Sequence, residues 1–429
     1  MPKRVLAAGM AVILAAVAPG AAVAESTWAR IFSHWGYTAR FGRATATADG
    51  GCVVVGYTAA FGGYYYDGWV GKLDAEGKWQ WQKTLGGLGR DGFTEVIQTR
   101  DGGYLLVGYR SWESYYGGES WCVRMDSDGR KLWERTFAKV DLERVQESED
   151  GGFLLAGPDW DNEGCKLLKL DSVGGISLNR TYSPRLLIDV NTLGITPDGG
   201  AVIQASYNAI LKLDRSGDPQ WLKTYTLPAM RYGGLGSVTV MNDGGYLVVG
   251  GYSEGGCAVL KLDSNGDPAW SERIDLESYY LVSGYEDRDG TIVIATAGQG
   301  AALARLDSSG QVLWAKRYRV SGEKGNLTVS PSADGSIILA ASRSAYDFHL
   351  LLYSKGFAFR TSWDGTIDAC EGLVKPLDPT VEPLDVKIKV LSSTASEPEV
   401  VMSSPVSRVL PASVGAYDIC AHLEEGGER

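Results

Sequence analysis

Residues 94–137 read TEVIQTRDGGYLLVGYRSWESYYGGESWCVRMDSDGRKLWERTF, and this stretch decides the fold. Its DGG and DSDG segments are typical of tight hairpin turns, because glycine adopts the positive φ that such turns need. The turns are flanked by four short apolar runs, TEVIQT, YLLVGY, WCVRM and KLWERTF. The stretch therefore predicts four antiparallel strands, with a longer polar and aromatic loop between the second and the third.

The same unit recurs along the chain. The Asp-Gly turn of the first hairpin returns every 45 to 52 residues, at Asp49, Asp101, Asp150, Asp198, Asp243, Asp289 and Asp334. A second signature places a tryptophan seven positions after an aspartate, at Asp74/Trp81, Asp126/Trp133, Asp214/Trp221, Asp263/Trp270 and Asp307/Trp314, and Asp171/Leu178 keeps the spacing without the indole. Repeats of this length with four short strands each indicate a propeller. We predict an all-β, seven-bladed β-propeller of four-stranded antiparallel blades.

The Asp-to-Trp spacing has a structural explanation. The aspartate can accept backbone N–H bonds at the start of the turn, and the glycine that follows takes the left-handed position. The tryptophan then falls on the outer strand, where its flat ring can pack between neighbouring blades. We interpret these residues as structural.

The two ends of the repeat region complement each other. Trp28–Phe32 matches an outer strand with no repeat in front of it, whereas the last unit, which includes Phe357–Gly365, lacks an outer strand. The simplest solution is that residues 28–32 complete the seventh blade, because a closed ring leaves no sheet edge.

The first 24 residues have the features of a signal peptide. Lys3 and Arg4 precede the apolar segment Val5–Val17, which is too short to span a bilayer, and Ala22-Val23-Ala24 is a small-x-small cleavage site. We expect a mature chain that starts at Glu25, no integral membrane segment after cleavage, and a secreted, periplasmic or cell-surface location.

The predicted domains are the signal peptide 1–24, the propeller 25–370 and a small C-terminal β-like appendage 371–429. The appendage is rich in Pro, Ser and Val, with one alternating stretch, VKIKV; a disordered tail is the alternative. Cys370 and Cys420 bracket it, and an oxidising compartment would favour a disulfide between them. The other four cysteines fall inside predicted strands and are expected to be small buried side chains.

Charge and composition exclude some functions. The formal net charge is −11, and removal of Lys3 and Arg4 makes the mature chain more acidic, which argues against nucleic acid and anionic lipid as partners. The three histidines, His34, His349 and His422, have no companion at metal-ligand spacing. No nucleophile elbow or phosphate-binding loop is present. We therefore expect no metal and no cofactor.

Aromatic residues distinguish the loops of the first two blades. In an antiparallel blade the loop between strands two and three shares one face with the connector to the next blade, while both hairpin turns lie on the other face. Such aromatic rings suit sugar stacking or peptide contact, although they can equally pack loops onto the blades. The candidate ligand-binding residues are Trp35, Tyr64, Tyr65, Tyr66, Trp112, Tyr115 and Tyr116.

The units resemble a family of secreted prokaryotic propeller repeats with the pattern DGGYhhhGY followed by WhhKLDxxGxxxWxKxY. Asp101–Tyr109 and Trp121–Phe137 match it closely, and the resemblance extends over residues 28–370. It implies the propeller fold and a location outside the cytoplasm, and little chemistry. The turns are also similar to the tryptophan-docking motif of quinoprotein propellers, but the chain lacks their adjacent cysteines and has seven repeats instead of eight.

Three functions fit the sequence. The first is an exported binding or scaffold module for a glycan, peptide or protein. The second is a carbohydrate-active enzyme, which would need at least two acidic groups converging near the central opening; Asp67, Glu113, Asp159 and Asp161 are available. The third is a purely structural envelope component. We favour the binding module, with no catalytic residue assigned.

Overall fold

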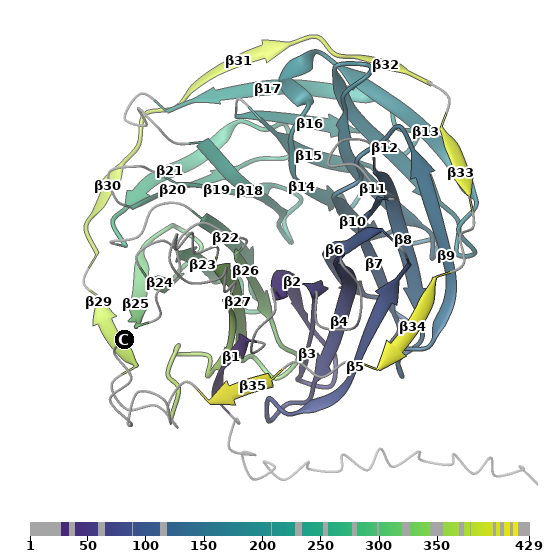
Figure 1. Ribbon diagram of the computed structural model, residues 1–429. Coiled ribbons are helices and arrows are strands. Elements are labelled where there is room, and N and C mark those ends of the chain that lie inside the picture. The colour runs from purple at the N-terminus through teal and green to yellow at the C-terminus, as the bar shows by residue number, and fades with distance from the viewer. Residues whose placement is uncertain are drawn as a thin grey trace, which may run out of the picture.

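The strands of the chain form seven sheets arranged around a central opening (Figure 1). This computed structural model confirms the seven-bladed β-propeller. Among the described residues the only helix is the short 3-10 turn η1 (Arg185–Leu187), and no helix is long and apolar enough to cross a membrane. The described residues are 27–33, 39–58, 65–87, 89–111, 118–206, 208–227, 234–251, 256–276, 281–297, 300–319, 327–343, 355–368, 373–377, 379–397, 400–403, 407–411 and 415–418.

Each blade has four antiparallel strands, ordered from the central opening outward and consecutive in the chain in blades 1 to 6; blade 7 takes its fourth strand from the N-terminal segment. Blades 1 to 3 are β2 (Ala39–Ala46), β3 (Cys52–Thr58), β4 (Asp67–Leu73), β5 (Trp79–Gly86); β6 (Arg90–Gln98), β7 (Tyr104–Ser111), β8 (Glu119–Met125), β9 (Lys131–Ala138); and β10 (Arg144–Glu147), β11 (Phe153–Asp159), β12 (Gly164–Leu170), β13 (Ile176–Ser183). Blades 4 and 5 are β14 (Val190–Ile195), β15 (Ala201–Ala205), β16 (Ala209–Leu213), β17 (Pro219–Thr226); and β18 (Gly234–Val240), β19 (Tyr246–Gly251), β20 (Cys257–Leu262), β21 (Pro268–Ile274). Blades 6 and 7 are β22 (Leu281–Glu286), β23 (Ile292–Ala297), β24 (Ala301–Leu306), β25 (Val312–Tyr318); and β26 (Leu327–Pro331), β27 (Ile337–Arg343), β28 (Lys355–Thr361), β1 (Trp28–Ser33).

The hydrophobic core lies between blades. Val53 and Val70 of blade 1 pack in one cluster with Tyr104, Leu106 and Val123 of blade 2, all of them buried. Because each blade is covered on both faces, its second and third strands are almost continuously apolar instead of alternating. This explains why the sequence reads YLLVGY and not a polar-apolar alternation.

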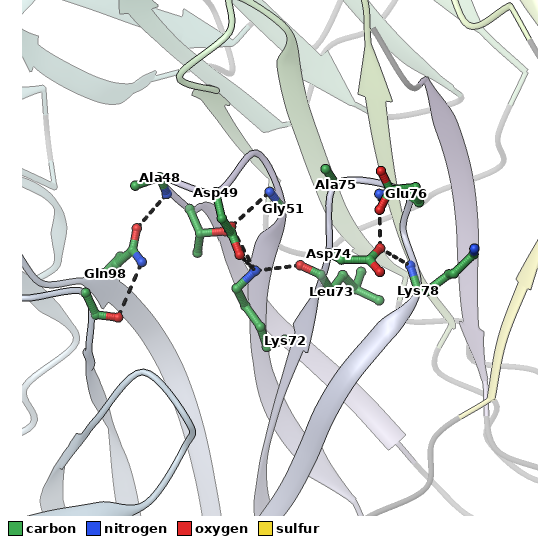
Figure 2. Close-up of polar contacts among 12 residues, drawn as sticks. Ala48, Asp49, Gly51, Lys72, Leu73, Asp74, Ala75, Glu76, Lys78 and Gln98 are labelled. Carbon is green, nitrogen blue, oxygen red and sulfur yellow. Dashed lines mark hydrogen bonds and ion pairs between the residues drawn. The ribbon is translucent and has the colours of Figure 1, made fainter. Parts of the chain in front are cut away.

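One face of the ring carries both hairpin turns of blades 1 to 6, together with the first hairpin turn of blade 7 and the turn that follows β28, and we call it the turn face. In Figure 2 the Asp49 carboxylate accepts the Gly51 backbone N–H at 3.1 Å and the Lys72 ammonium at 2.8 Å. Desolvation acts to raise the pKa of Asp49, but these bonds outweigh it and the pKa is lowered. The same pair recurs in every blade, as Asp49–Lys72, Asp101–Arg124, Asp150–Lys169, Asp198–Lys212, Asp243–Lys261, Asp289–Arg305 and Asp334–Arg360.

The second turn behaves as the Asp-to-Trp spacing predicts. Asp74 accepts the backbone N–H groups of Glu76 at 3.0 Å and Lys78 at 2.8 Å (Figure 2). Gly77 has a φ of +72°. The tryptophan ring of each outer strand then lies against the turn glycine of the next blade. These contacts run round the ring, as Trp81 on Gly129, Trp133 on Gly174, Leu178 on Gly217, Trp221 on Gly266, Trp270 on Gly310, Trp314 on Gly365 and Trp28 on Gly77.

A matched pair of glycine substitutions tests this docking. A Cβ on Gly266 would lie 2.8 Å from the Trp221 ring, whereas a Cβ on Gly244, with nearly the same positive φ, would meet nothing within 4 Å. Both Gly→Ala changes carry the backbone strain of a positive φ. We expect Gly266→Ala to cost about 1–3 kcal/mol more than Gly244→Ala, because only it overpacks the interface. Thermal unfolding of the two variants measures the difference, and equal melting temperatures would contradict the docking.

The N-terminal strand closes the ring, as predicted from the sequence. β1 pairs with β28 in an antiparallel register that sets Trp28 opposite Arg360 and Ile31 opposite Phe357. Trp28 is buried, and its indole N–H donates to the Ala75 carbonyl of blade 1 at 3.0 Å. The first strand of the chain therefore bonds the seventh blade and docks on the first.

The C-terminal tail has the expected β character and wraps the ring as a belt (Figure 1). Its strands are β29 (Val374–Leu377), β30 (Val381–Pro383), β31 (Lys387–Leu391), β32 (Thr394–Ser396), β33 (Val401–Ser403), β34 (Arg408–Pro411) and β35 (Gly415–Asp418). They pair in turn with the outer strands of blades 6, 5, 4, 3, 2, 1 and 7. Each blade thus gains a fifth strand, and the belt covers the outer edge of all seven sheets.

A buried polar network fixes the belt near blade 2. The Glu134 carboxylate accepts Ser407 Oγ–H and the Ser407 backbone N–H, both at 2.7 Å, together with the Trp121 indole N–H at 3.1 Å. Lys131 donates to the same carboxylate at 2.5 Å. Glu134 and Ser407 are both buried, so this contact holds the belt to blade 2 at Ser407, just before β34.

The four described cysteines are buried within strands, as the sequence predicted. Cys52, Cys122, Cys165 and Cys257 are buried free thiols in four different blades, and burial raises the pKa of Cys52 to about 12. They act as small apolar side chains. The predicted Cys370–Cys420 bond lies outside the described residues, as does the predicted signal peptide.

Candidate functional site

The face opposite the turns carries the loops between strands two and three and the blade connectors, and we call it the loop face. Of the residues predicted to bind a ligand there, Tyr65 and Tyr66 are described. The positions that lie outside the described residues are Trp35, Tyr64, Trp112, Tyr115 and Tyr116.

The two described tyrosines have different surroundings. Tyr65 is 40% exposed, and the Arg90 guanidinium carbon lies 6.0 Å from its ring centroid. The Tyr66 ring packs at 4.9 Å on Tyr57, and its carbonyl accepts the Asp91 backbone N–H at 2.7 Å. Tyr65 is therefore available to a ligand, whereas Tyr66 helps to pack its loop on blade 1.

A pair of carboxyl groups lies at the junction of blades 1 and 2, on residues close in the chain to Tyr65 and to its contact Arg90. A Cβ on Gly86 would lie 2.2 Å from Asp67 Oδ1 and 2.8 Å from Asp91 Oδ2, so both carboxyls crowd the space over this glycine. Asp91 is fully buried and accepts the Gly87 N–H at 2.8 Å. Arg110 Nε is 3.9 Å from its other oxygen.

Both carboxyl groups hold their protons more tightly than usual. Burial raises the pKa of Asp67 to about 6. Burial also raises the pKa of Asp91 to about 6, with a further contribution from Asp67, against the lowering effect of Arg110. The pair is poised to change charge close to neutral pH, which is a property found often at functional sites.

This pair predicts a pH dependence of stability. Between the ordinary aspartate pKa near 4 and about 6, folded Asp67 keeps a proton that the unfolded chain has released, so stability falls as pH rises through this window. Asp67→Asn removes the loss of stability that comes from ionising this carboxyl group. We therefore expect the variant to have a higher melting temperature than the parent at pH 7.5 and the same melting temperature at pH 4.

Asp49→Asn is the matched control with the opposite sign. The pKa of Asp49 is lowered, so its stabilising contribution is present at neutral pH and is lost as pH falls through the lowered pKa. This variant should be less stable than the parent at pH 7.5, with a difference that shrinks towards pH 3. Melting curves of both variants over pH 3–8 make the comparison; a destabilised Asp67→Asn at pH 7.5 would refute the raised pKa.

A second aromatic residue stands out on the loop face, over blade 3. Trp160 is 58% exposed and occupies the tight turn between β11 and β12. Asp159 Oδ1 accepts the Asn162 backbone N–H at 3.1 Å and its Nδ2 at 2.9 Å. The other oxygen accepts Thr181 Oγ–H at 2.6 Å and lies 3.8 Å from the buried Lys166 ammonium. Desolvation lowers the pKa of Lys166, although Asp159 opposes this.

This network decides the role of Asp159. Its carboxylate is buried and occupied by structural donors, so it anchors the turn instead of facing a substrate. Of the acids that the sequence offered to an enzyme, Asp67 lies in the blade 1–2 pair, Asp161 lies in the Trp160 turn, and Glu113 is outside the described residues. The structure does not bring the described three together.

The connector into blade 3 places further carboxyl groups beside Trp160. The Asp141 backbone N–H donates to the Pro158 carbonyl at 3.3 Å, and the Glu143 backbone N–H donates to the Ala156 carbonyl at 2.9 Å. The connector therefore lies along the end of β11. Gly157 permits this approach, because a Cβ there would stand 1.8 Å from the Asp141 carbonyl oxygen.

Partial desolvation perturbs these two acids as well, although Asp141 is exposed and the Glu143 side chain is 37% exposed. Desolvation raises the pKa of Asp141, although a hydrogen bond from the Trp160 side chain opposes it. Desolvation also raises the pKa of Glu143; Arg144 opposes the rise, and Asp141 and Asp189 add to it. Sequence reasoning missed this cluster. The signal available was an Asp-x-Glu connector followed by a tryptophan in an otherwise short loop.

Inner-strand charges continue from this cluster towards the central opening, where β2, β6 and β10 lie side by side (Figure 1). Arg43 of β2 lies 3.5 Å from Glu95 of β6, and Arg144 of β10 lies 3.8 Å from the same carboxylate. Each pair joins the inner strands of two blades. Within the described part of the chain no group of three or more His, Cys, Asp or Glu side chains is arranged to hold a metal ion.

The two faces therefore differ in their electrostatics. The aspartates of the first hairpin turns are paired with a Lys or Arg and their pKa values are lowered, as for Asp101 and Asp243. The carboxyl groups with raised pKa values, Asp67, Asp91, Asp141 and Glu143, all lie on the loop face. The repeat gives the first-turn aspartate of every blade a cationic partner. The four loop-face carboxyl groups, by contrast, have desolvation that nearby cations compensate at most in part.

Comparison with known proteins supports the fold. The chain is similar to the Pan2 WD40 domain of Neurospora crassa, with a TM-score of 0.51, 12% identity, and coverage of 78% of this chain and 96% of that domain. A protein of unknown function from Bacteroides caccae is also similar, with a TM-score of 0.42, 11% identity, and coverage of 67% of this chain and 93% of that one. A europium-containing methanol dehydrogenase has a TM-score of 0.44, 11% identity, and coverage of 73% of this chain and 80% of that one. No known family model and no curated protein matches the chain.

These findings define a class and nothing narrower. The chain is a seven-bladed β-propeller, and this fold does not by itself define a function. The repeat family suggested by its sequence pattern remains a resemblance.

Proposed function

We propose that this propeller is an exported binding module that holds a glycan, peptide or protein partner on the loop face over blades 1 and 2. The observation that carries the proposal is the exposed Tyr65 ring, which contacts Arg90, together with the Asp67–Asp91 pair on residues that adjoin both in the chain. An aromatic face beside incompletely compensated carboxyls offers stacking and hydrogen-bond acceptance to one ligand. The turn face, by contrast, repeats one satisfied ion pair in every blade.

The location is part of the proposal and rests on the N-terminal sequence. A basic start, a short apolar segment and a small-x-small site precede the first strand. Mass spectrometry of the protein recovered from the exporting cell would show a mature chain that starts at Glu25. A retained N-terminus in the cytoplasmic fraction would contradict export.

The aromatic residues provide the test of binding. A glycan and peptide screen of the mature chain identifies the ligand. Replacing Tyr65, Trp112 and Tyr116 together by alanine should then abolish binding and leave the melting temperature nearly unchanged; the exposed Tyr65 ring contributes little to folding. A triple variant that unfolds, yet still binds in its folded fraction, would show that these rings pack loops and that the site lies elsewhere.

A further inference from the structure

We propose a second binding site on the loop face, centred on Trp160, that takes the guanidinium or ammonium group of an arginine or lysine side chain presented by a peptide or protein. This second site goes beyond the proposed function, which concerns blades 1 and 2, and it is tested independently of that function. The site combines the exposed Trp160 ring with the carboxyl groups of Asp141 and Glu143.

The first argument is the exposure of Trp160 on a rigid support. A 58% exposed indole leaves a large apolar surface in water, and exposed tryptophans on soluble proteins are frequent anchors of interaction sites. The turn below it is fixed by the buried Asp159 carboxylate with its bonds to Asn162 and Thr181. The ring is therefore presented in one place before a ligand arrives, which lowers the entropic cost of binding.

The second argument is charge. Within the described part of the chain, no Lys or Arg forms an ion pair with Asp141, Asp161 or Asp189, and Arg144 shares its guanidinium between Glu143 and Glu95. The Asp141 backbone N–H donates to the Pro158 carbonyl at 3.3 Å, so Asp141 is held next to the turn that carries Trp160, and the Trp160 side chain acts to lower the pKa of Asp141. A cation over the ring face would interact with both the indole and these carboxylates.

The alternative occupant is a neutral sugar, which also stacks on tryptophan. A sugar would leave the negative charge of the connector carboxylates uncompensated in a partly desolvated place, whereas an arginine or lysine side chain would compensate it. The net charge of −11 acts in the same direction, since it attracts cationic partners over a distance.

Fluorine NMR of the mature chain labelled with 5-fluorotryptophan tests the site. Trp363 provides an internal control, because it is also 58% exposed but lies in a hairpin turn on the opposite face, beside Asp364, a carboxylate already bonded to Ser362 and Thr366. Trp160→Phe and Trp363→Phe assign the two resonances. The probes are the capped peptide Gly-Arg-Gly and its citrulline analogue, which has nearly the same shape and no charge.

We expect the arginine peptide to shift the Trp160 resonance and not that of Trp363, with a midpoint on the order of millimolar for so small a ligand. The citrulline peptide should bind at least about tenfold more weakly, and Asp141→Asn should weaken the arginine peptide about three- to tenfold. The shift should diminish in 0.5 M NaCl.

Three results would overturn the assignment. Equal shifts of Trp160 and Trp363 would show unspecific contact, and equal binding of the arginine and citrulline peptides would remove the role of charge. A shift of Trp160 by neutral oligosaccharides, with none by the arginine peptide, would assign the site to a glycan. If Asp141→Asn does not fold, binding of the same peptides to Trp160→Phe can be measured by calorimetry instead. This variant keeps the charge of the site and removes the indole, so we expect it to lose binding of the arginine peptide.

Discussion

A mature chain that starts at residue 34 should be much less stable than one that starts at residue 25. The deletion removes β1, which pairs with β28 on one side and with β35 on the other. It also removes the buried Trp28 from the interface with blade 1. Loss of a buried tryptophan alone costs about 3–5 kcal/mol, and the opened sheet edges add to this, so we expect the melting temperature to fall by about 10 °C or more.

The point variant Trp28→Ala separates the two contributions. It keeps the strand and the backbone pairing but removes the ring that docks on Gly77, so its melting temperature should lie between those of the parent and the deletion. Differential scanning calorimetry of the three proteins makes the comparison. A deletion with the melting temperature of the parent would show that β1 does not close the ring.

A chain that ends at residue 368 should expose the outer edge of all seven sheets. Outer strands that now bond the belt would present unpaired N–H and C=O groups to water and to other molecules. We expect a lower melting temperature and concentration-dependent association, followed by light scattering. A monomer as stable as the parent would mean that the belt contributes nothing to the edges it covers.

Stepwise truncation gives a sharper version of the same experiment. The belt runs past blades 6, 5, 4, 3, 2, 1 and 7 in that order, so a chain ending at residue 411 should lose amide protection only in β1. A chain ending at residue 403 should also lose it in β5, and the loss of Ser407 would leave Glu134 without two of its donors. Hydrogen exchange read by mass spectrometry resolves the strands. Simultaneous loss in every blade after the first truncation would contradict a belt that binds each blade separately.

Much of the ring could be predicted from residues, because the repeat expresses local chemistry. Asp74 and Gly77 specify a turn through bonds that span four residues, and the seven-residue spacing then places each tryptophan on an outer strand. Closure by Trp28 followed from counting strands. These features depend on short-range geometry that the sequence repeats seven times.

The belt and the Trp160 site could not be predicted in this way. The belt strands are three to five residues long, and their partners lie far away in the chain. The sequence VKIKV alone does not predict that this segment pairs with β17. Trp160 and Asp141 belong to different loops and meet because Gly157 lets the connector approach β11. Such contacts depend on the tertiary structure, for which a single sequence has no repeated signal.

The belt also has a consequence for how the protein reaches its native state. Arg30 pairs with Asp418, so the first strand of the chain bonds the last. Neither end can be placed until seven blades exist, and closing so long a loop is entropically costly and slow. The ring therefore stays open until residues 415–418 can pair with β1. Folding of this propeller should show one late, rate-limiting phase that reports the joining of the two ends in blade 7.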